Sequence, residues 1–230
     1  MKRFHPVLLL LYGYASFVRA QNGIPAPAPG PGASPEPRNL AYSIESVVRY
    51  HDSGEYERAI QLVAKSAEEY LANRVAHRRP NENLVAVFDI DETALSNWAT
   101  LFDCGFCSYS TQVRFYPPPA HDPAIPPVLH LFNFAREKGI AVFFVTGRQE
   151  DQQARTVGNL QEAGYSGWTG LIMQPIGNRD PASVFKPRDR QQIVAQGYTI
   201  ALNIGDQASD LVGCCAERVF KLPNPFYLIK

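Results

Sequence analysis

Two aspartates stand one residue apart directly after an apolar run. The run is Leu84-Val85-Ala86-Val87-Phe88, and Asp89 and Asp91 follow it. Such a run predicts a strand buried on both faces, so the aspartates stand where a strand ends and a loop begins. In an open parallel sheet that end faces the ligand crevice. One acid could act there as a nucleophile and the other as a proton donor, which suggests phosphoryl transfer. Aspartates are also common helix caps and loop residues.

A threonine and a glycine follow the next predicted strand. The apolar run Ile140–Val145 predicts a second buried strand, and Thr146-Gly147-Arg148 comes directly after it. A hydroxyl group and free backbone N–H groups at a strand end suit a phosphate oxygen, and a glycine allows close approach. A tight turn with Thr146 as a helix cap is the structural alternative.

A lysine stands at the predicted start of the helix before the fourth strand, in Phe185-Lys186-Pro187. Its charge could pair with the Asp89 carboxylate and with phosphoryl oxygens, which would offset the repulsion of an anionic substrate. A single lysine at a helix start usually faces solvent, so Lys186 gains significance only from the other motifs.

Two further acids follow the predicted strand Tyr198–Ile204. Asp206 and Asp210 stand four residues apart after Gly205. Beside Asp89 they would form an oxygen-rich pocket for Mg²⁺, which prefers carboxylates, carbonyls and water. The helix dipole also favours acids at a helix N-terminus. The order of the motifs along the chain, an acid pair, a threonine, a lysine and a second acid pair, favours a catalytic site.

Strands alternate with helices from residue 84 to the end of the chain. Three helices are predicted to end at Gly139, Gly164 and Gly197, and two short strands are predicted at 171–173 and Arg218–Leu222. This alternation predicts an α/β fold, with a Rossmann-like parallel sheet and helices on both of its faces.

The first twenty residues have the composition of a secretory signal peptide. Lys2 and Arg3 precede an apolar stretch at 7–18, and Ala20 is a small residue that suits cleavage. The stretch is shorter than the about 20 apolar residues that a membrane-spanning helix needs. We therefore expect cleavage near Ala20, no stable membrane anchor, and a periplasmic or secreted protein.

Residues 21–38 are rich in proline and predict a disordered tether. Residues 39–230 then form the expected catalytic domain. Its N-terminal part, from Leu40 to about Arg74, places apolar residues on one stripe and predicts two helices separated near Ser53-Gly54. Residues 94–126, aromatic and proline-rich, are predicted to be a small cap-like insertion over the site; a packed surface loop is the alternative.

Charge gives no sign of a nucleic-acid partner. The chain has 22 basic and 22 acidic residues, and its only short basic run is His77-Arg78-Arg79. Such a run is usually a solvated helix end or loop. We expect a small phosphomonoester as the binding partner, no nucleic acid polymer, and leave a homo-oligomer open.

Four cysteines in an exported chain permit two disulfides. Cys104 and Cys107 could close a small loop, whereas Cys214 and Cys215 could each reach elsewhere. The connectivity is not readable from the sequence. A zinc site is the alternative, although the adjacent Cys-Cys pair and the lack of a nearby histidine fit zinc poorly.

These motifs together resemble the haloacid dehalogenase superfamily. Within it they are similar to the secreted class B/C-like acid phosphatases of subfamily IIIB, related to plant acid phosphatases and vegetative storage proteins. The matching stretches are 88–97, 145–148, Phe185-Lys186 with Arg190, and 205–211, and the similarity runs from about residue 40 to the end.

The resemblance implies a phosphoaspartyl mechanism. Asp89 would attack phosphorus, and Asp91 would protonate the leaving oxygen and later deprotonate the attacking water. Thr146 and Gly147 would hold phosphate oxygens, and Lys186 would steady both Asp89 and the phosphoryl group. A halide leaving group needs no proton, so Asp91 favours phosphate ester cleavage over dehalogenation.

The resemblance also implies a set of Mg²⁺ ligands. These are Asp89, the backbone carbonyl of Asp91, Asp206 and, directly or through water, Asp210. Cations are needed because a carboxylate attacks a phosphate dianion poorly unless their repulsion is cancelled. Asp91 does not use its side chain for the metal, so we expect it to be freer to carry a proton.

The predicted function is therefore a secreted Mg²⁺-dependent acid phosphatase for small phosphomonoesters. Nucleoside monophosphates stacked on aromatic residues of 94–126 are one candidate substrate class. A non-catalytic storage or phosphate-binding protein on the same fold is the alternative from another class. A phosphotransferase, with an alcohol as acceptor in place of water, would use the same residues.

Overall fold

The structure is a computed structural model that describes residues 37–107 and 121–229. The chain divides into two units, Met1–Leu40 and Ala41–Lys230, and the sheet and the helices that pack on it belong to the second. The predicted signal peptide and nearly all of the predicted tether lie outside the described residues, as do residues 108–120 of the predicted insertion.

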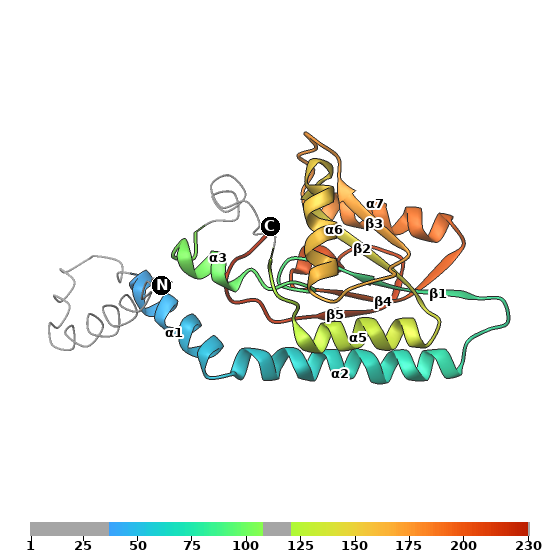
Figure 1. Cartoon of the computed structure of the whole chain (residues 1–230), viewed down its shortest axis with the longest axis horizontal. Helices are drawn as coiled ribbons and strands as arrows, with labels where there is room; N and C mark the ends of the chain where they lie inside the picture. Colours follow the sequence, from blue (N-terminus) through green and yellow to red (C-terminus); the bar gives the residue numbers. More distant parts are fainter. Residues whose placement is uncertain (1–36, 108–120, 230) are drawn as a thin grey trace, which may run out of the picture. The chain divides into compact units, whose positions relative to one another are not determined.

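A parallel sheet forms the centre of the described part of the chain (Figure 1). It has five strands there, in the order β3-β2-β1-β4-β5. Phe88 at the end of β1 pairs with Phe144 of β2 and Ile204 of β4, so the carboxyl ends of these strands share one edge. The chain order reverses between β1 and β4, the place where α/β sheets bind ligands. The strands are β1 (Asn83–Phe88), β2 (Ala141–Gln149), β3 (Gly170–Gln174), β4 (Tyr198–Gly205) and β5 (Ala216–Lys221).

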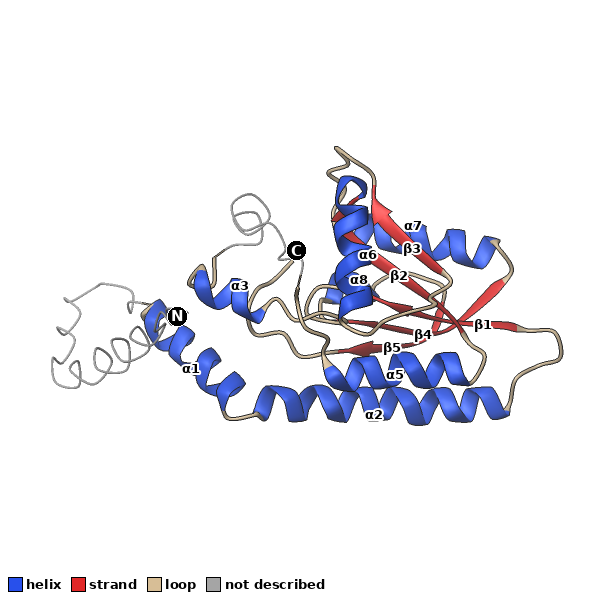
Figure 2. Cartoon of the chain, in the orientation of Figure 1, coloured by secondary structure: helices blue, strands red, loops and turns tan. Residues whose placement is uncertain are grey.

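Helices cover both faces of the sheet (Figure 2). In β1, Leu84, Ala86 and Phe88 belong to the larger apolar cluster, which includes residues of α2 (Glu55–Ala76) and α5 (Pro126–Glu137). Val85 and Val87 point the other way and pack with Ile193 of α7 (Ala182–Ala195). Burial on both sides is why this strand is a continuous apolar run. The predicted α/β fold with a parallel sheet is confirmed.

Within the described residues, two helices precede the sheet, as predicted for the segment from Leu40 to about Arg74. They are α1 (Leu40–Asp52) and α2, and they are separated at Gly54, whose φ is 75°. Glycine adopts this left-handed conformation without the steric cost that other residues carry. A stripe of α2 that includes Ile60 and Leu71 is buried against the core. Among the described residues, no helix is long and apolar enough to cross a membrane.

The segment between β1 and α5 is described only at its two ends. It contains α3 (Trp98–Asp103), and Leu95 forms isolated bridges with Asp91 and Ala124. The ring of Trp98 stacks on His51 of α1, with 3.6 Å between ring centroids. The cap-like role of this insertion stays a prediction.

Two predicted boundaries are wrong. Strand β2 continues to Gln149, so Thr146-Gly147-Arg148 lies in the strand, at an irregular pairing with β3, and not after it. Helix α7 begins at Ala182, so Lys186 lies in its second turn and not at its start. The apolar pattern that predicted the strand ends at Val145. The strand continues beyond it because backbone pairing does not require apolar side chains. Two short helices, η2 (Glu150–Gln152) and α6 (Gln153–Glu162), follow β2.

All four cysteines of the chain form disulfides between close neighbours. Cys104 and Cys107 close the small loop that the sequence suggested. Cys214 and Cys215 bond to each other, a pairing that could not be read from the sequence, and neither reaches elsewhere. With every thiol oxidised, the alternative of a cysteine zinc site finds no support, because zinc binds thiolates.

Candidate active site

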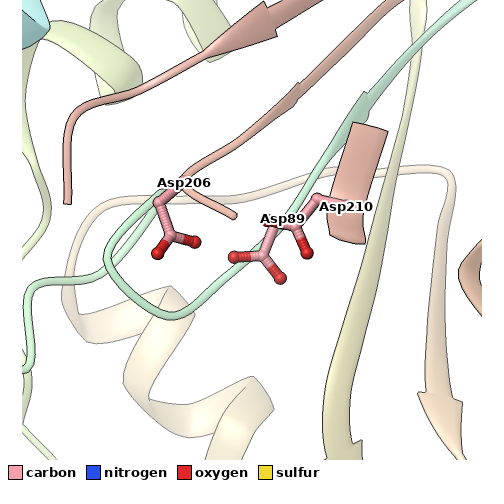
Figure 3. Close-up of side chains that lie close together, drawn as sticks. All are labelled: Asp89, Asp206 and Asp210. Atoms are coloured by element: carbon pink, nitrogen blue, oxygen red, sulfur yellow. The ribbon is translucent and has the colours of Figure 1, made fainter. Parts of the chain in front are cut away.

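Three aspartates meet at the carboxyl ends of β1 and β4 (Figure 3). Asp89 follows β1, Asp206 follows β4, and Asp210 belongs to the short helix α8 (Ala208–Leu211). One carboxylate oxygen of each lies within 4.8 Å of the others. The backbone N–H of Asp89 donates to the carbonyl of Ile204 at 3.0 Å, which joins the two strand ends. The parallel register thus brings Asp89, which follows β1, together with Asp206 and Asp210, which come much later in the chain after β4.

Lys186 of α7 links two of these acids. Its buried Nζ lies 2.6 Å from Oδ1 of Asp89 and 2.6 Å from Oδ1 of Asp210. Burial alone would lower the pKa of this amine, but the two carboxylates raise it above its ordinary value, so the amine is charged. Burial and the neighbouring acids hold the pKa of Asp89 well above its ordinary value in spite of Lys186. The cluster therefore holds more negative charge than one lysine offsets.

The loop after β4 is tightly built. A Cβ at Gly205 would lie 2.5 Å from Cβ of Asp210, so only glycine fits there. Oδ2 of Asp210 accepts a hydrogen bond from the backbone N–H of Gln207 at 2.8 Å, as part of a capping box. Oδ2 of Asp206 accepts from the amides of Gln207 and Asn224, both at 2.6 Å. These contacts fix the direction in which each acid points.

Asp91 has a different partner, Arg148 of β2. Its Oδ1 accepts from the guanidinium at 2.7 Å and from Nδ2 of Asn97 at 2.9 Å. Burial by itself raises the pKa of Asp91, but Arg148 and Asn97 reverse this effect and hold the pKa below its ordinary value. The expectation that Asp91 is freer to carry a proton is therefore wrong for the arrangement seen here, because Arg148 favours the ionised form.

A second carboxylate lies near the same arginine. Oδ2 of Asp122 is 3.6 Å from the Arg148 guanidinium, and among the described residues it has no hydrogen-bond partner. Burial raises the pKa of Asp122 to about 7, against the opposing effect of Arg148. Asn159 holds the backbone of Asp122 through a hydrogen bond of 2.8 Å to its carbonyl. The insertion thus delivers a buried acid to the edge of the site.

The three predicted phosphate-binding residues, Thr146, Gly147 and Lys186, differ in their access to the site. Thr146 is fully buried, and its hydroxyl accepts a hydrogen bond from the backbone N–H of Arg148 at 3.1 Å. Gly147 lines a cavity of about 180 Å³. That cavity is where the acid cluster reaches solvent, since Asp89, Lys186 and Asp206 also line it. Its other walls include Phe185, Gln174, Asp180, Tyr227 and Ile229.

Sequence reasoning missed several residues of the site. Arg148 was visible in the Thr146-Gly147-Arg148 motif, but nothing local showed that it faces Asp91. Glu92 is fully buried, accepts from the Tyr56 hydroxyl at 2.8 Å, and has its pKa raised by burial to about 8. Nothing in the pattern around Asn224, Tyr227 or Asp122 marked these residues. The chain brings them to the site only through tertiary contacts.

The residues fit a divalent cation. The four aspartates of the predicted metal set face two cations, Lys186 and Arg148, which leaves two negative charges uncompensated when all are ionised. Carboxylate oxygens are ligands that Mg²⁺ prefers. Oδ1 of Asp206 accepts only a long hydrogen bond, 3.3 Å from Thr93, among the described residues. The side chain of Asp91 is held by Arg148, so a part for Asp91 would be left to its backbone carbonyl.

This acid cluster and buried lysine at the switch point of a parallel sheet define a phosphohydrolase of the α/β class. Residues 37–230 match the family described as HAD superfamily, subfamily IIIB (acid phosphatase), so the chain belongs to that family of phosphomonoesterases. The resemblance that the sequence motifs suggested is confirmed.

Curated plant proteins are similar to the chain over most of its length. Vegetative storage protein 2 of Arabidopsis thaliana is 35% identical over 181 residues, which cover 77% of this chain and 68% of that protein. Acid phosphatase 1 of Solanum lycopersicum is 35% identical over 179 residues, covering 76% and 69%. The relatives thus include proteins named for storage as well as one named for phosphatase activity.

A solved structure shares the fold. The class C acid phosphatase of Bacillus anthracis superposes with a TM-score of 0.66, covering 81% of this chain and 85% of that chain. The two sequences are 20% identical. At this level of identity the likeness supports the sheet topology and not a particular substrate.

Proposed function

We propose that the protein is a Mg²⁺-dependent acid phosphatase that hydrolyses small phosphomonoesters through a phosphorylated Asp89. One observation carries the proposal. Nζ of Lys186 lies 2.6 Å from Asp89 and from Asp210, and these residues line a cavity that Asp206 also lines. A charged amine and an acid cluster around one buried carboxylate are what nucleophilic attack on a phosphate dianion requires.

The reaction has two displacements on phosphorus. In the first, Asp89 forms a bond to phosphorus while the ester P–O bond breaks, and Asp91 gives a proton to the leaving oxygen. In the second, Asp91 takes a proton from water, the water oxygen forms a bond to phosphorus, and the bond between phosphorus and Asp89 breaks. Lys186 stays charged throughout and balances the anionic phosphoryl group. Gly147, which lines the cavity, and Thr146, which is buried next to it in β2, are proposed to hold phosphate oxygens.

Asp91 must exchange its partner to do this work. In the free site Arg148 favours the ionised form of Asp91, whereas proton donation needs the protonated form. An arriving phosphate dianion would compete for the Arg148 guanidinium, which binds phosphate in a bidentate manner as readily as carboxylate. Weakening of the Arg148–Asp91 pair would raise the pKa of Asp91 when substrate is bound.

The acid cluster of Asp89, Asp206 and Asp210, with the backbone carbonyl of Asp91, would hold the metal. Bound Mg²⁺ supplies positive charge that offsets the repulsion between Asp89 and the phosphate. Substrates are proposed to be small phosphomonoesters, and nucleoside monophosphates stay one candidate class. Trp98, one of the aromatic residues of 94–126, already stacks on His51.

Export from the cytoplasm is part of the proposal. Two disulfides fit an oxidising compartment, and one relative of this chain bears the name stem 28 kDa glycoprotein, in Glycine max. The predicted signal peptide at 1–20, the absence of a nucleic-acid partner and a homo-oligomer all stay predictions.

A storage role is the second candidate, because relatives named vegetative storage proteins match 77% of this chain. The intact set of Asp89, Asp91, Lys186 and Asp206 favours catalysis over storage. A phosphotransferase would differ only in the acceptor that reaches the cavity, so product analysis with added alcohol separates it from a hydrolase.

Hydrolysis of p-nitrophenyl phosphate tests catalysis. We expect activity with Mg²⁺, none with excess chelator, and a loss of about 10⁴-fold or more in Asp89→Asn, because an amide is not a nucleophile towards phosphorus. Asp52→Asn, the same change at an exposed position of α1, is the matched control and should retain activity. Comparable hydrolysis by Asp89→Asn and wild type would refute the assigned nucleophile. An inactive but folded wild type would favour storage.

A further inference from the structure

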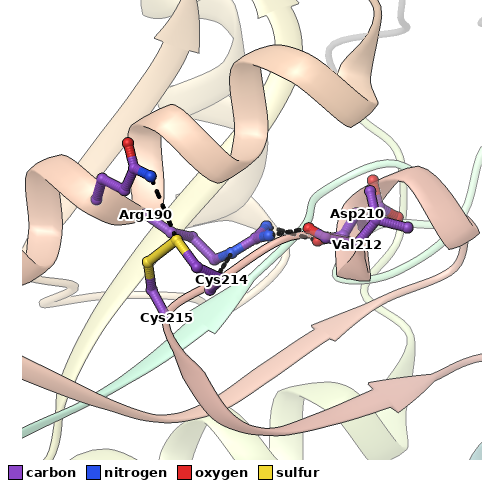
Figure 4. Close-up of a disulfide and its surroundings, with 6 residues drawn as sticks. Arg190, Asp210, Val212, Cys214 and Cys215 are labelled. Atoms are coloured by element: carbon purple, nitrogen blue, oxygen red, sulfur yellow. Dashed lines mark hydrogen bonds between the residues drawn. A yellow bond between two sulfur atoms is a disulfide. The ribbon is translucent and has the colours of Figure 1, made fainter.

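A buried arginine holds the segment 206–215, which includes the short helix α8 and is named here the Asp210 loop (Figure 4). Arg190 lies one turn after Lys186 in α7 and is 1% exposed. Its guanidinium donates to the carbonyl of Asp210 at 2.7 Å, to the carbonyl of Cys214 at 3.2 Å, and to the carbonyl of Val212. Three backbone carbonyls of one loop thus converge on one planar group with a fixed geometry.

The same loop presses on the turn of α7 that carries Lys186. Gly213 has a φ of 88°, and a Cβ there would lie 2.8 Å from Cβ of Pro187, the residue after Lys186. Arg190 and Pro187 therefore fix the distance between α7 and the loop from two positions. That distance decides whether the amine of Lys186 reaches Asp210 and Asp89 together, at 2.6 Å from each.

The Cys214–Cys215 disulfide closes the end of this loop. Cys214 is an exposed residue, and Cys215 has a φ of 94°, a conformation that residues other than glycine rarely adopt. A bond between adjacent side chains removes freedom from the backbone between them. The bonded pair thereby keeps the Cys214 carbonyl turned towards Nε of Arg190.

We propose that Arg190 is a positioning residue for the Lys186–Asp210–Asp89 contacts, and that the Cys214–Cys215 disulfide keeps it so, which makes turnover sensitive to reduction. The inference rests on the proposed phosphatase function of the same site. In this proposal, an exposed disulfide affects the buried residues of the site through the side chain of Arg190.

The redox step is a thiol–disulfide exchange with a dithiol reductant. A thiolate of the reductant attacks one sulfur of the pair, and the S–S bond between Cys214 and Cys215 breaks. The second thiol of the reductant then attacks the mixed disulfide, and the protein sulfur leaves as a thiol. The reductant ends as its own disulfide, having given up two electrons and two protons, and Cys214 and Cys215 end as thiols. Cys215 is then free to leave its positive φ, and the Cys214 carbonyl to leave Arg190.

The chain contains its own control. The other disulfide, Cys104–Cys107, closes a loop after α3, on a different element from the Asp210 loop. We compare Cys214→Ser/Cys215→Ser with Cys104→Ser/Cys107→Ser, measuring kcat and KM for p-nitrophenyl phosphate before and after dithiothreitol. Wild type and the Cys104/Cys107 variant should lose about 10-fold in kcat on reduction, as expected when reacting groups shift by a fraction of an ångström. The Cys214/Cys215 variant should be slow from the start and insensitive to reduction.

Arg190→Lys separates positioning from stability. Lysine keeps the charge, but its single ammonium cannot serve three carbonyls at once. We expect a fall in kcat with little change in KM, measured at a temperature well below the thermal midpoint of the variant. If Arg190 were only structural, the midpoint would fall while kcat at low temperature stayed unchanged.

Three results would overturn the inference. One is full kcat in Cys214→Ser/Cys215→Ser, and another is equal loss on reduction in both cysteine variants. The third is a reduced wild type as fast as the oxidised form. An oxidised wild type without activity on any phosphomonoester would be a different failure, since it would refute the proposed function itself, and the inference with it.

Discussion

The two aspartates of the first motif lie in opposite electrostatic surroundings, although only Ile90 separates them. Asp89 faces Asp206 and Asp210 with one lysine between, and its pKa is raised by burial and by those acids. Asp91 turns the other way, to Arg148, and its pKa is lowered. The first half of the site, around Asp89, Asp206 and Asp210, has an excess of negative charge. In the second half, the charge of Asp91 is balanced by that of Arg148.

The difference shows how two aspartates that are only two positions apart in the sequence can take different roles. The half around Asp89 is incomplete without further positive charge, which suits a nucleophile that works beside a cation. The half around Asp91 is complete as it stands, so it must be disturbed before Asp91 can carry a proton. Substrate phosphate is the group that could do so, since it competes for the same arginine.

The largest effect should come from removing Lys186, the cation that pairs with Asp89 and Asp210. Lys186→Met leaves Asp89 and Asp210 facing each other without the amine between them. We expect kcat/KM for p-nitrophenyl phosphate to fall by about 10³-fold, the size of effect seen for a lost charge at a developing anion. Lys138→Met, at an exposed position of the chain, should leave kcat/KM unchanged. A variant at Lys186 with about a tenth of normal activity or more would contradict the role assigned to this amine.

The second half can be tested through the leaving group. Asp91→Asn should slow hydrolysis of an alkyl ester such as glycerol phosphate by about 10²- to 10⁴-fold, because an alkoxide needs a proton to leave. p-Nitrophenolate leaves without one, so the loss on p-nitrophenyl phosphate should be much smaller. Values of kcat/KM on the two esters, wild type against variant, measure the contrast, because kcat/KM reports the first displacement and not the later hydrolysis of the phosphorylated enzyme that both esters share. Equal losses of kcat/KM on both esters would mean that Asp91 acts on binding and not as a proton donor.

Metal binding should stabilise the first half even without turnover. At about 100 times its dissociation constant, Mg²⁺ should raise the thermal midpoint by about 5 °C, as a ligand that binds only the folded state does. Asp206→Asn should abolish most of this rise, because it removes one of the three clustered carboxylates. Calorimetry with Mg²⁺ and with chelator measures the shift. An unchanged shift in the variant would place the cation elsewhere.

The smallest effect should come from Asp122, beside the balanced half. Its pKa is raised by burial to about 7. Between about pH 4 and pH 7 the unfolded chain ionises this group while the folded protein resists doing so, so its contribution to stability is lost as pH rises through 7. Asp122→Asn lacks this loss, so its thermal midpoint should gain on that of wild type as pH rises from 4 to 7.5. A constant difference across that range would contradict the raised pKa.

Sequence patterns predicted most of the fold because burial leaves a local record. Leu84–Phe88 is apolar throughout since both of its faces are covered, and this alone located β1 within one residue. Gly54 marked the break between α1 and α2 because a positive φ favours glycine. The extent of β2 was missed, because Thr146 and Arg148 are polar residues that complete the strand and face the site.

The candidate site was predicted in part. Asp89, Lys186, Asp206 and Asp210 meet as expected, although Lys186 lies inside a helix and not at its start. Arg148 as the partner of Asp91 was not foreseen. Neither were Asp122 and Asn224, because a hydrogen bond between residues far apart in the chain leaves no trace in spacing.

The sequence by itself determined which chemistry is available. The sequence contains two aspartates after a predicted strand, a later lysine and a second acid pair. Their order along the chain is typical of the family. The tertiary structure decided how those groups are charged, since a pKa depends on burial and on neighbours that only folding supplies. It also decided the pairing of Cys214 with Cys215, because that bond requires one backbone conformation among the many that the chain allows.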